Sequence, residues 1–218
     1  MSWEMHGSKL VGLADEQCDL WPNELWYVVP SRTHYSPYDG KKVRPLEFAY
    51  VLHNASLAKG LLISPTRMAE GREPRTLKGG AASEAENLLE TLRQEHCPER
   101  PSRLRCYFLN RDKDVAEYRI GDTLRGNKTL VRCFVVLNGA KVHYADSRIY
   151  ERLEGRPDDA PLAISYWQTF EPQSEEDRRN LEVVADCALY FPDWKTFPTI
   201  PFESLVQWQQ DNPPPLAQ

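Results

Sequence analysis

The stretch of residues 83–118 constrains the fold more than any other part of the chain. It opens with Ser83 and Glu86, whose spacing predicts a capping box at the start of a helix. Pro98 and Pro101 end this helix, because proline lacks an N–H and disfavours helical geometry in the residue before it. Between these limits, apolar residues recur with the period of one helix face, at Ala85, Leu88, Leu89 and Leu92.

A run of aromatic and aliphatic residues, 104–109, follows the prolines and predicts a strand that carries Tyr107. A polar turn then leads into one or two helical turns at 112–118. This order of elements holds Tyr107 at a defined place, although most strand tyrosines belong to the core. Arg103 and Arg105 alternate, so on a strand both would point to one face. We interpret Arg105 as solvated or ion-paired, and Arg103 either in that way or as a contact to a phosphate or an acidic partner.

The rest of the chain alternates between strand and helix patterns, which predicts a single α+β domain over residues 21–208. Asn138-Gly139 is typical of a hairpin turn, with 141–144 as the returning strand. We expect a loose lead-in over residues 1–20, a mobile surface loop over 64–80 and a disordered tail over 209–218. Strands are expected at 24–30, 129–137 and 181–191, a short apolar segment lies at 61–63, and helices are expected at 45–57 and, after the cap Asp159, at 160–170.

Charge and cysteine content exclude several classes of protein. A net charge of −5 over 218 residues gives no general attraction to nucleic acid. Five cysteines without a CxxC pair favour free thiols in a reducing compartment over disulfides or a zinc site. No apolar stretch approaches the ~20 residues that cross a bilayer, and no charged leader precedes a hydrophobic run. We therefore expect a cytoplasmic protein, with leaderless export left open.

Common catalytic motifs are absent from the sequence, which contains no GxGxxG, P-loop, GxSxG or HExxH pattern. The five histidines stand apart without metal-ligand spacing, so we expect no metal. We interpret His6, His53 and His143 as ordinary surface or core residues. Cys97 follows the predicted helix, and a helix C-terminus disfavours a thiolate, so we exclude it as a nucleophile.

The segment NLLxxLRQEHCPERPSRLRCYF, within residues 84–108, resembles a segment of mostly bacterial proteins related to the ADP-ribosyltransferase fold. Those proteins carry a helix that ends in an Arg-x-Glu-x-x-Pro-x-x-Pro-Ser-Arg-like run, followed by a strand with an aromatic residue. The similar order of motifs extends over residues 25–191. The resemblance implies a single domain of split antiparallel sheets with flanking helices.

The wider ADP-ribosyltransferase superfamily carries three motifs on separate strands: a His or Arg, then a Tyr or Ser, then a Glu. Tyr107 is similar to the middle motif, and Glu182 is similar to the last, in which the Glu heads a strand. Residues 26–32 occupy the place of the first motif, and Tyr27 fits its aromatic. Val28 stands where typical members have the His that binds the adenosine ribose of NAD.

The resemblance implies an effector-like transferase that uses NAD as its substrate and modifies a macromolecule. Breaking the bond between nicotinamide and ribose builds positive charge on the sugar, as in glycoside hydrolysis. Glu182 would stabilise that oxocarbenium, and Tyr107 would stack on the nicotinamide. The hypothesis requires these two side chains to face each other across one hollow. We expect a protein acceptor, since the net charge does not favour nucleic acid, and no membrane partner; the sequence leaves the oligomeric state open.

Several further residues are assigned to NAD binding by the same resemblance. Tyr27 would contact the dinucleotide, and Arg32 beside Ser31 would bind the pyrophosphate. Arg32 or His34 would substitute for the missing His, and Tyr118 is a second choice for the stacking ring.

A non-catalytic interaction module on the same fold is the alternative hypothesis. Val28 would then mark the loss of NAD binding. The aromatic residues near the C-terminus, Trp194, Phe197 and Trp208, would form a partner surface.

Overall fold

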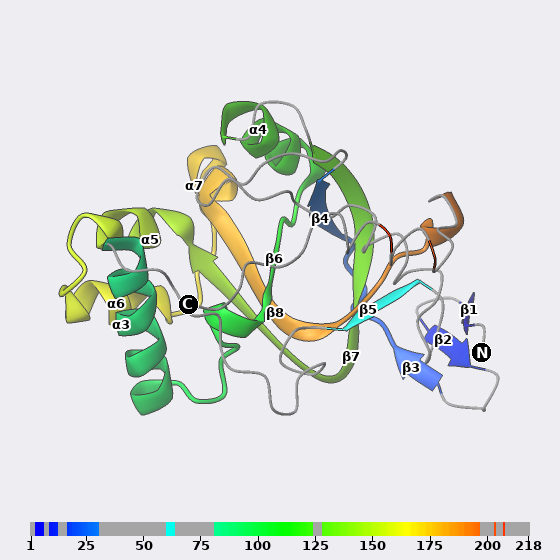
Figure 1. Cartoon of the computed structure of the whole chain (residues 1–218), viewed down its shortest axis with the longest axis horizontal. Helices are drawn as coiled ribbons and strands as arrows, with labels where there is room; N and C mark the ends of the chain where they lie inside the picture. The colour runs from blue at the N-terminus through cyan, green and yellow to red at the C-terminus, as the bar shows by residue number, and fades with distance from the viewer. Residues whose placement is uncertain are drawn as a thin grey trace.

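The computed structural model describes residues 3–6, 9–12, 17–30, 60–63, 81–123, 128–196, 203 and 207. They form a mixed α+β structure with a five-stranded and a three-stranded antiparallel sheet (Figure 1). The strands are β1 (Trp3–His6), β2 (Lys9–Gly12), β3 (Gln17–Asp19), β4 (Leu25–Pro30), β5 (Leu61–Ile63), β6 (Tyr107–Leu109), β7 (Lys128–Asp146) and β8 (Leu181–Tyr190). The helices are α3 (Ala81–His96), α4 (Lys113–Thr123), α5 (Ser147–Glu154), α6 (Ala160–Tyr166) and α7 (Glu175–Asn180), with single 3₁₀ turns at Arg103–Arg105 and Trp194–Thr196.

The larger sheet has the order β4-β7-β8-β5, and β6 pairs with β8 on the same edge as β5. Its longest strand, β7, has 19 residues and pairs with β4 along its first part and with β8 along most of its length. The sheet curls strongly (Figure 1). Trp26 of β4 and Asn110, directly after β6, exchange two backbone hydrogen bonds of 2.8 and 3.0 Å. The first and last strands of the curl therefore meet.

The inner face of the curled sheet is packed with side chains from β4, β6, β7 and β8. Period-2 alternation sends every second residue of each strand inward, where burial of apolar surface stabilises the fold. This inner core contains Leu25, Tyr107, Leu109, Val131, Cys133, Val135, Val183, Ala185, Cys187, Leu189 and Phe191.

The outer face of β7 and β8 is covered by α3, α5 and α6, which form a second core (Figure 1). The indole Nε1 of Trp167 donates to the carbonyl of Leu89 at 3.0 Å, which fixes the end of α6 against α3. Side-chain caps start the short helices, since Asp146, Asp159 and Ser174 each accept from a backbone N–H two or three residues on. This second core contains Ala85, Leu89, Leu92, Ala145, Leu153, Ala163, Tyr166, Trp167 and Val184.

Several sequence predictions agree with the observed elements. Strands β4 and β8 lie where they were expected, the short apolar segment at 61–63 forms strand β5, and Asp159 caps α6 through the N–H of Leu162 at 3.0 Å. Helix α3 begins at Ala81, two residues before the predicted cap Ser83, and ends before Pro98. The predicted helix at 45–57, the predicted loop at 64–80 and the predicted tail at 209–218 lie outside the described residues.

Three predictions about local structure are wrong. The Asn138-Gly139 pair does not reverse the chain, because both flanking segments pair with β8 and β7 is continuous around an irregularity between Val136 and Lys141. Residues 1–20 were expected to be loose, yet β1, β2 and β3 form the small sheet. Arg103 and Arg105 lie in one 3₁₀ turn rather than alternating on a strand.

Among the described residues, no helix combines the length and apolar character that crossing a bilayer requires.

Candidate functional site

Tyr107 and Glu182 point to opposite faces of the sheet. Tyr107 pairs directly with Ala185, and directly opposed residues of an antiparallel pair share a face. Glu182 is three residues from Ala185, an odd number, so it points to the other face, where its cross-strand partner Ala145 belongs to the outer core. The expectation that Tyr107 and Glu182 face one hollow is therefore wrong.

The inner face brings Tyr27 and Tyr107 together, as the resemblance implied, but inside a packed core. Their ring centroids are 5.7 Å apart and nearly perpendicular, and Tyr27 makes a similar contact with Phe191 at 5.9 Å. Tyr107 is 8% exposed, and its burial raises the pKa of the phenol well above its ordinary value. Both rings are thus core residues, and the space between them is filled.

Of the other residues assigned to NAD binding, Tyr118 does not join this pair. Tyr118 lies on α4, is 53% exposed and contacts the guanidinium of Arg179 at 5.2 Å. Ser31, Arg32 and His34 lie outside the described residues.

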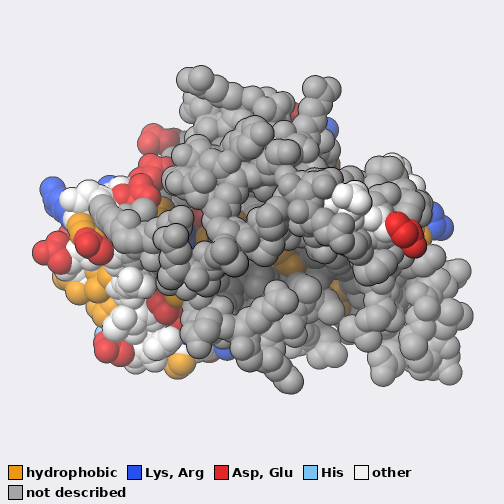
Figure 2. Space-filling model, viewed as in Figure 1, with side chains coloured by type: hydrophobic (Ala, Val, Ile, Leu, Met, Phe, Trp, Pro, Cys, Tyr) orange, Lys and Arg blue, Asp and Glu red, His pale blue; other side chains and the backbone are white. Residues whose placement is uncertain are grey.

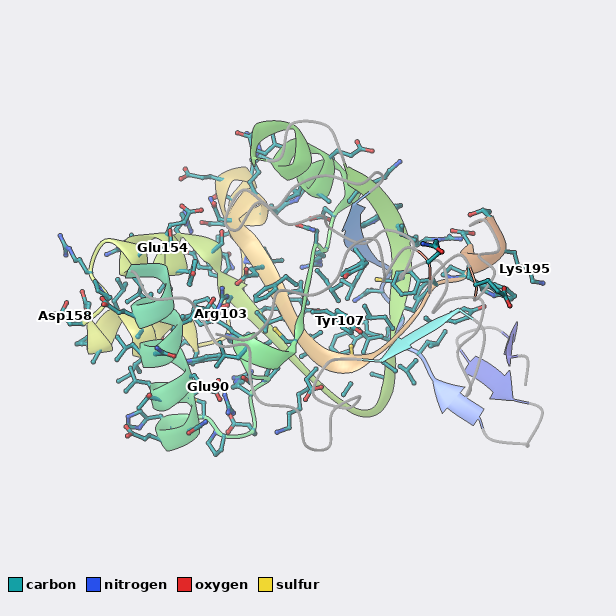
Figure 3. The ribbon with its side chains drawn as sticks, in the orientation of Figure 1. Glu90, Arg103, Tyr107, Glu154, Asp158 and Lys195 are labelled. Carbon is teal, nitrogen blue, oxygen red and sulfur yellow. The ribbon has the colours of Figure 1, made fainter. Side chains whose placement is uncertain are left out.

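Glu182 belongs instead to a polar cluster between α3, α6 and the outer face of the sheet, centred on Arg103 (Figure 3). Arg103 Nε and Nη2 donate to the two carboxylate oxygens of Glu86, each at 3.0 Å. Arg103 Nη1 donates to Glu182 Oε1 and to the hydroxyl of Tyr166. We call Glu86, Arg103, Tyr166 and Glu182 the Arg103 cluster.

Aromatic rings enclose the guanidinium of the Arg103 cluster. Its Cζ lies 4.4 Å from the ring centroid of Tyr150, 4.8 Å from that of Phe108 and 5.0 Å from that of Tyr166. Cation–π contacts of this kind suit a planar guanidinium with little solvent access. The Arg103 side chain is 5% exposed, whereas Phe108 is 38% exposed.

The electrostatics of the Arg103 cluster favour charged partners. Burial opposes the charge on Arg103, but the carboxylates of Glu182 and Glu86 outweigh burial and raise its pKa well above the ordinary value. Burial, reinforced by the charge of Glu182, likewise raises the pKa of Tyr166, so its hydroxyl stays protonated and donates to Glu182 Oε1 at 2.6 Å. One guanidinium faces two carboxylates, which leaves a net charge of −1.

Glu182 is held through one of its two oxygens. Both of its hydrogen bonds end on Oε1, and Oε2 contacts no hydrogen-bond donor among the residues that the structure describes. The side chain is 16% exposed and stands at the start of β8, one residue after Leu181. The arrangement fixes the carboxylate through Oε1 and leaves Oε2 without a donor among the described residues.

Sequence reasoning missed most of this cluster. Glu86 was expected to complete a capping box, but its carboxylate binds Arg103. Phe108 was overlooked in favour of Tyr107, an adjacent aromatic residue that points to the other face of the sheet. Tyr166 and Tyr150 carried no motif that would have linked them to Glu182. The acidic-partner contact considered for Arg103 is its environment in the fold, formed within the chain.

His143 is a core residue, as the sequence suggested. It is fully buried, and its Nε2 donates to the carbonyl of Tyr166 at 2.9 Å. Burial lowers its pKa to about 4, so it is neutral near pH 7. Cys97, Cys106 and Cys133 are free thiols, and the described part of the chain holds no group of three or more His, Cys, Asp or Glu side chains placed to bind a metal ion.

A surface cavity of about 420 Å³ lies elsewhere on the sheet, beside the start of β4. Within it, Arg132 pairs with Asp193 at 3.2 Å and with Glu24 at 3.9 Å. It includes none of the predicted site residues, and its lining is Glu24, Trp26, Leu130, Val131, Arg132, Asp193 and Thr196.

Fold and site together define a mixed α+β protein that holds a carboxylate on the outer face of a curled antiparallel sheet. No protein-family model matches the chain, and no curated protein matches it. The Arg103 cluster is therefore the basis on which a function is proposed.

Proposed function

We propose that the chain is an NAD-dependent ADP-ribosyltransferase, of the ADP-ribosyltransferase-like fold, whose reactive carboxylate is Glu182. One observation carries the proposal: Glu182 is fixed through Oε1 by Arg103 and Tyr166, while Oε2 makes no contact with a donor among the described residues. The mixed α+β architecture and the position of Glu182 at the head of a strand support the same assignment.

The chemistry requires a negative charge that acts mainly in the transition state. When the bond from ribose C1′ to nicotinamide breaks, its electron pair leaves with nicotinamide and the sugar becomes cationic. The net charge of −1 on the Arg103 cluster stabilises that cation more than it stabilises NAD, and this difference accelerates the reaction. A nucleophile of the acceptor then forms the new bond to C1′ and loses its proton.

The version of the hypothesis that required Tyr107 and Glu182 to share one hollow fails, because they lie on opposite faces of the sheet. In the version proposed here, Phe108 replaces Tyr107 as the stacking ring. Phe108 pairs with Val184 and so shares the outer face with Glu182, and it is 38% exposed. An aromatic ring on this face, beside the guanidinium of Arg103, suits the flat nicotinamide. Tyr107 and Tyr27 have no part in this version, because Tyr107 belongs to the inner core and Tyr27 is partly buried against it.

The acceptor is proposed to be a protein with a basic segment. Figure 2 shows Asp and Glu side chains, with some Lys and Arg among them, over the helical side of the molecule, where α3, α5 and α6 pack on the outer face of the sheet. The exposed carboxylates of this side include Glu151, Glu154 and Asp158. Such a surface attracts cations and repels the phosphates of nucleic acid.

Ser31, Arg32 and His34 keep their proposed contacts with the pyrophosphate and the adenosine ribose of NAD.

A non-catalytic interaction module is a second candidate, favoured by the ion pairs themselves. A buried guanidinium must be paired, and Glu86 and Glu182 satisfy Arg103 without any ligand. The proposed partner surface needs one correction: Trp194 packs against the inner core, so it is not an exposed aromatic. Phe197 and Trp208 lie outside the described residues.

Transfer of label from NAD tests the proposal. We expect the wild-type protein to transfer label, Glu182→Gln to lose transfer, and the control Glu117→Gln, an exposed glutamate on α4, to retain it. Calorimetric titration with NAD separates the two candidates. Absence of binding at millimolar NAD favours the interaction module, and undiminished transfer by Glu182→Gln overturns the role of that carboxylate.

A further inference from the structure

We infer that a row of three polar side chains on α3 is a positioning device that fixes Arg103 and, through Arg103, Glu182. The row consists of Glu86, Glu90 and Arg93, which are spaced by four and three residues and therefore share one helix face. Its effect on catalysis rests on the proposed function, whereas its effect on Arg103 does not.

The row binds the segment between α3 and the 3₁₀ turn. Arg93 Nη1 donates to the carbonyl of Arg100 at 3.1 Å and to that of Pro98 at 3.3 Å. Glu90 Oε2 accepts from the hydroxyl of Ser102 at 2.8 Å. The backbone from 98 to 102 is thus tied to the helix at three points directly before Arg103.

Glu90 connects the members of the row to each other. Its two oxygens accept from Nη2 and Nε of Arg93 at 2.7 and 3.0 Å, so one carboxylate holds both Arg93 and Ser102. Burial acts to raise the pKa of Glu90, but the hydrogen bonds from Arg93 and Ser102 outweigh it and the pKa is lowered. Glu90 is therefore an anion at neutral pH and keeps these contacts.

The bound segment fixes the position of Arg103, which Figure 3 shows close to Glu90 beside α3. The bound segment brings its side chain to Glu86, the first member of the row, which accepts from Nε and Nη2. The remaining nitrogen, Nη1, then points to Glu182 Oε1. Glu90 touches neither Arg103 nor Glu182, so it acts on the reactive carboxylate only through the segment it holds.

Exchange of the Arg103 Nε proton tests the device directly. In wild-type protein labelled with ¹⁵N-arginine, we expect the Nε–H resonance of Arg103, assigned by its loss in Arg103→Lys, to exchange slowly. Glu90→Gln and, independently, Ser102→Ala should speed its exchange by about tenfold or more, because the guanidinium becomes more mobile. Glu95→Gln is the control, since Glu95 is an exposed residue of the same helix. Unchanged exchange in Glu90→Gln and Ser102→Ala would show that the row does not position Arg103.

Single-turnover kinetics tests the consequence for Glu182. We expect Glu90→Gln to slow label transfer by about tenfold while the affinity for NAD, measured by calorimetry, stays the same, because only the transition state gains from a fixed carboxylate. Equal transfer rates would overturn the link to Glu182. If the wild-type protein transfers no label, the proposed function fails, and proton exchange still decides whether the row positions Arg103.

Discussion

Arg103 and Glu182 are 79 residues apart in the sequence, yet Nη1 of the first forms an ion pair with Oε1 of the second. This contact joins the segment after α3 to the start of β8. Glu86 holds the opposite side of the same guanidinium, so one arginine connects the helical layer to the sheet. Removing a single member leaves the others buried without their partner.

Arg103→Ala should be among the most destabilising substitutions in the described chain. It leaves the carboxylates of Glu86 and Glu182 facing each other, and breaking a buried ion pair on one side costs about 3–5 kcal/mol. Urea denaturation measures the change in the free energy of unfolding. Arg156→Ala removes an exposed arginine and should change stability by less than about 0.5 kcal/mol. Equal effects of the two substitutions would contradict a central role for Arg103.

Tyr166→Phe should destabilise the protein by about 1–2 kcal/mol, because Glu182 Oε1 loses one of its two donors. The ring stays in place, so the effect reports the hydroxyl alone. Tyr118→Phe, at a side chain that is 53% exposed, is the matched control and should be nearly neutral. Thermal or chemical unfolding of both variants checks this, and a neutral Tyr166→Phe would count against the hydrogen bond to Glu182.

Tyr107→Ala should mainly reduce stability, whereas Phe108→Ala should mainly reduce NAD binding. Tyr107 is a core residue, so its truncation should cost about 3–5 kcal/mol of stability. Phe108 is 38% exposed on the face of Glu182, so its truncation should weaken NAD binding and cost less stability. Denaturation and calorimetry on the same two proteins make the comparison. Loss of NAD binding in a folded Tyr107→Ala, with Phe108→Ala unaffected, would reverse the assignment.

The free energy of unfolding should decrease as the pH falls, and part of this decrease should come from His143. Burial, followed by the charge of Arg100, lowers its pKa in the folded protein from 6.5 to about 4. The unfolded chain therefore binds more protons between these values, and the free energy of unfolding decreases by up to about 1.4 kcal/mol per pH unit as the pH falls from 6.5 to 4. His143→Gln keeps a donor for the carbonyl of Tyr166 but does not titrate. The stability of the wild-type protein relative to this variant should fall across that interval, and a constant difference would contradict the shift.

Gly60→Ala should destabilise the protein, since Gly60 has φ of +84° and an added Cβ would lie 2.5 Å from Cδ1 of Trp194. We expect a loss of about 1–3 kcal/mol. Gly155→Ala offers a control, because its φ is −87° and the nearest atom to an added Cβ is 3.5 Å away. That substitution should be neutral or stabilising by up to about 1 kcal/mol. Unfolding curves of the two variants give the comparison.

Local patterns in the sequence predicted the elements whose signals are local. The strands β4 and β8 follow from dense apolar runs, and the cap of α6 follows from Asp159. The Asn138-Gly139 turn failed because its signal ignores β8, which pairs with both sides and keeps β7 extended. Gly139 uses its positive φ of 66° within the strand irregularity instead.

The candidate site was predicted only in part. The sequence does not show which face of a strand a residue occupies, and the residues of the cluster lie far apart in the chain. Glu182 could be named from its place at the head of a strand, but no local signal says which face it shares with the strand 75 residues earlier. A shift by one residue exchanges the faces of a strand, so Phe108 and Tyr107 are indistinguishable until the partner Ala185 is known. The role of Arg103 stayed open because Glu86 and Tyr166, which bury it, come from other elements.

The backbone contact between Trp26 and Asn110 also bears on how this protein can change shape. With the strands tied end to end around a filled interior, the sheet acts as a rigid frame. Glu182 points away from that interior, so a molecule beside it would contact the outer face of the sheet and the helices packed there.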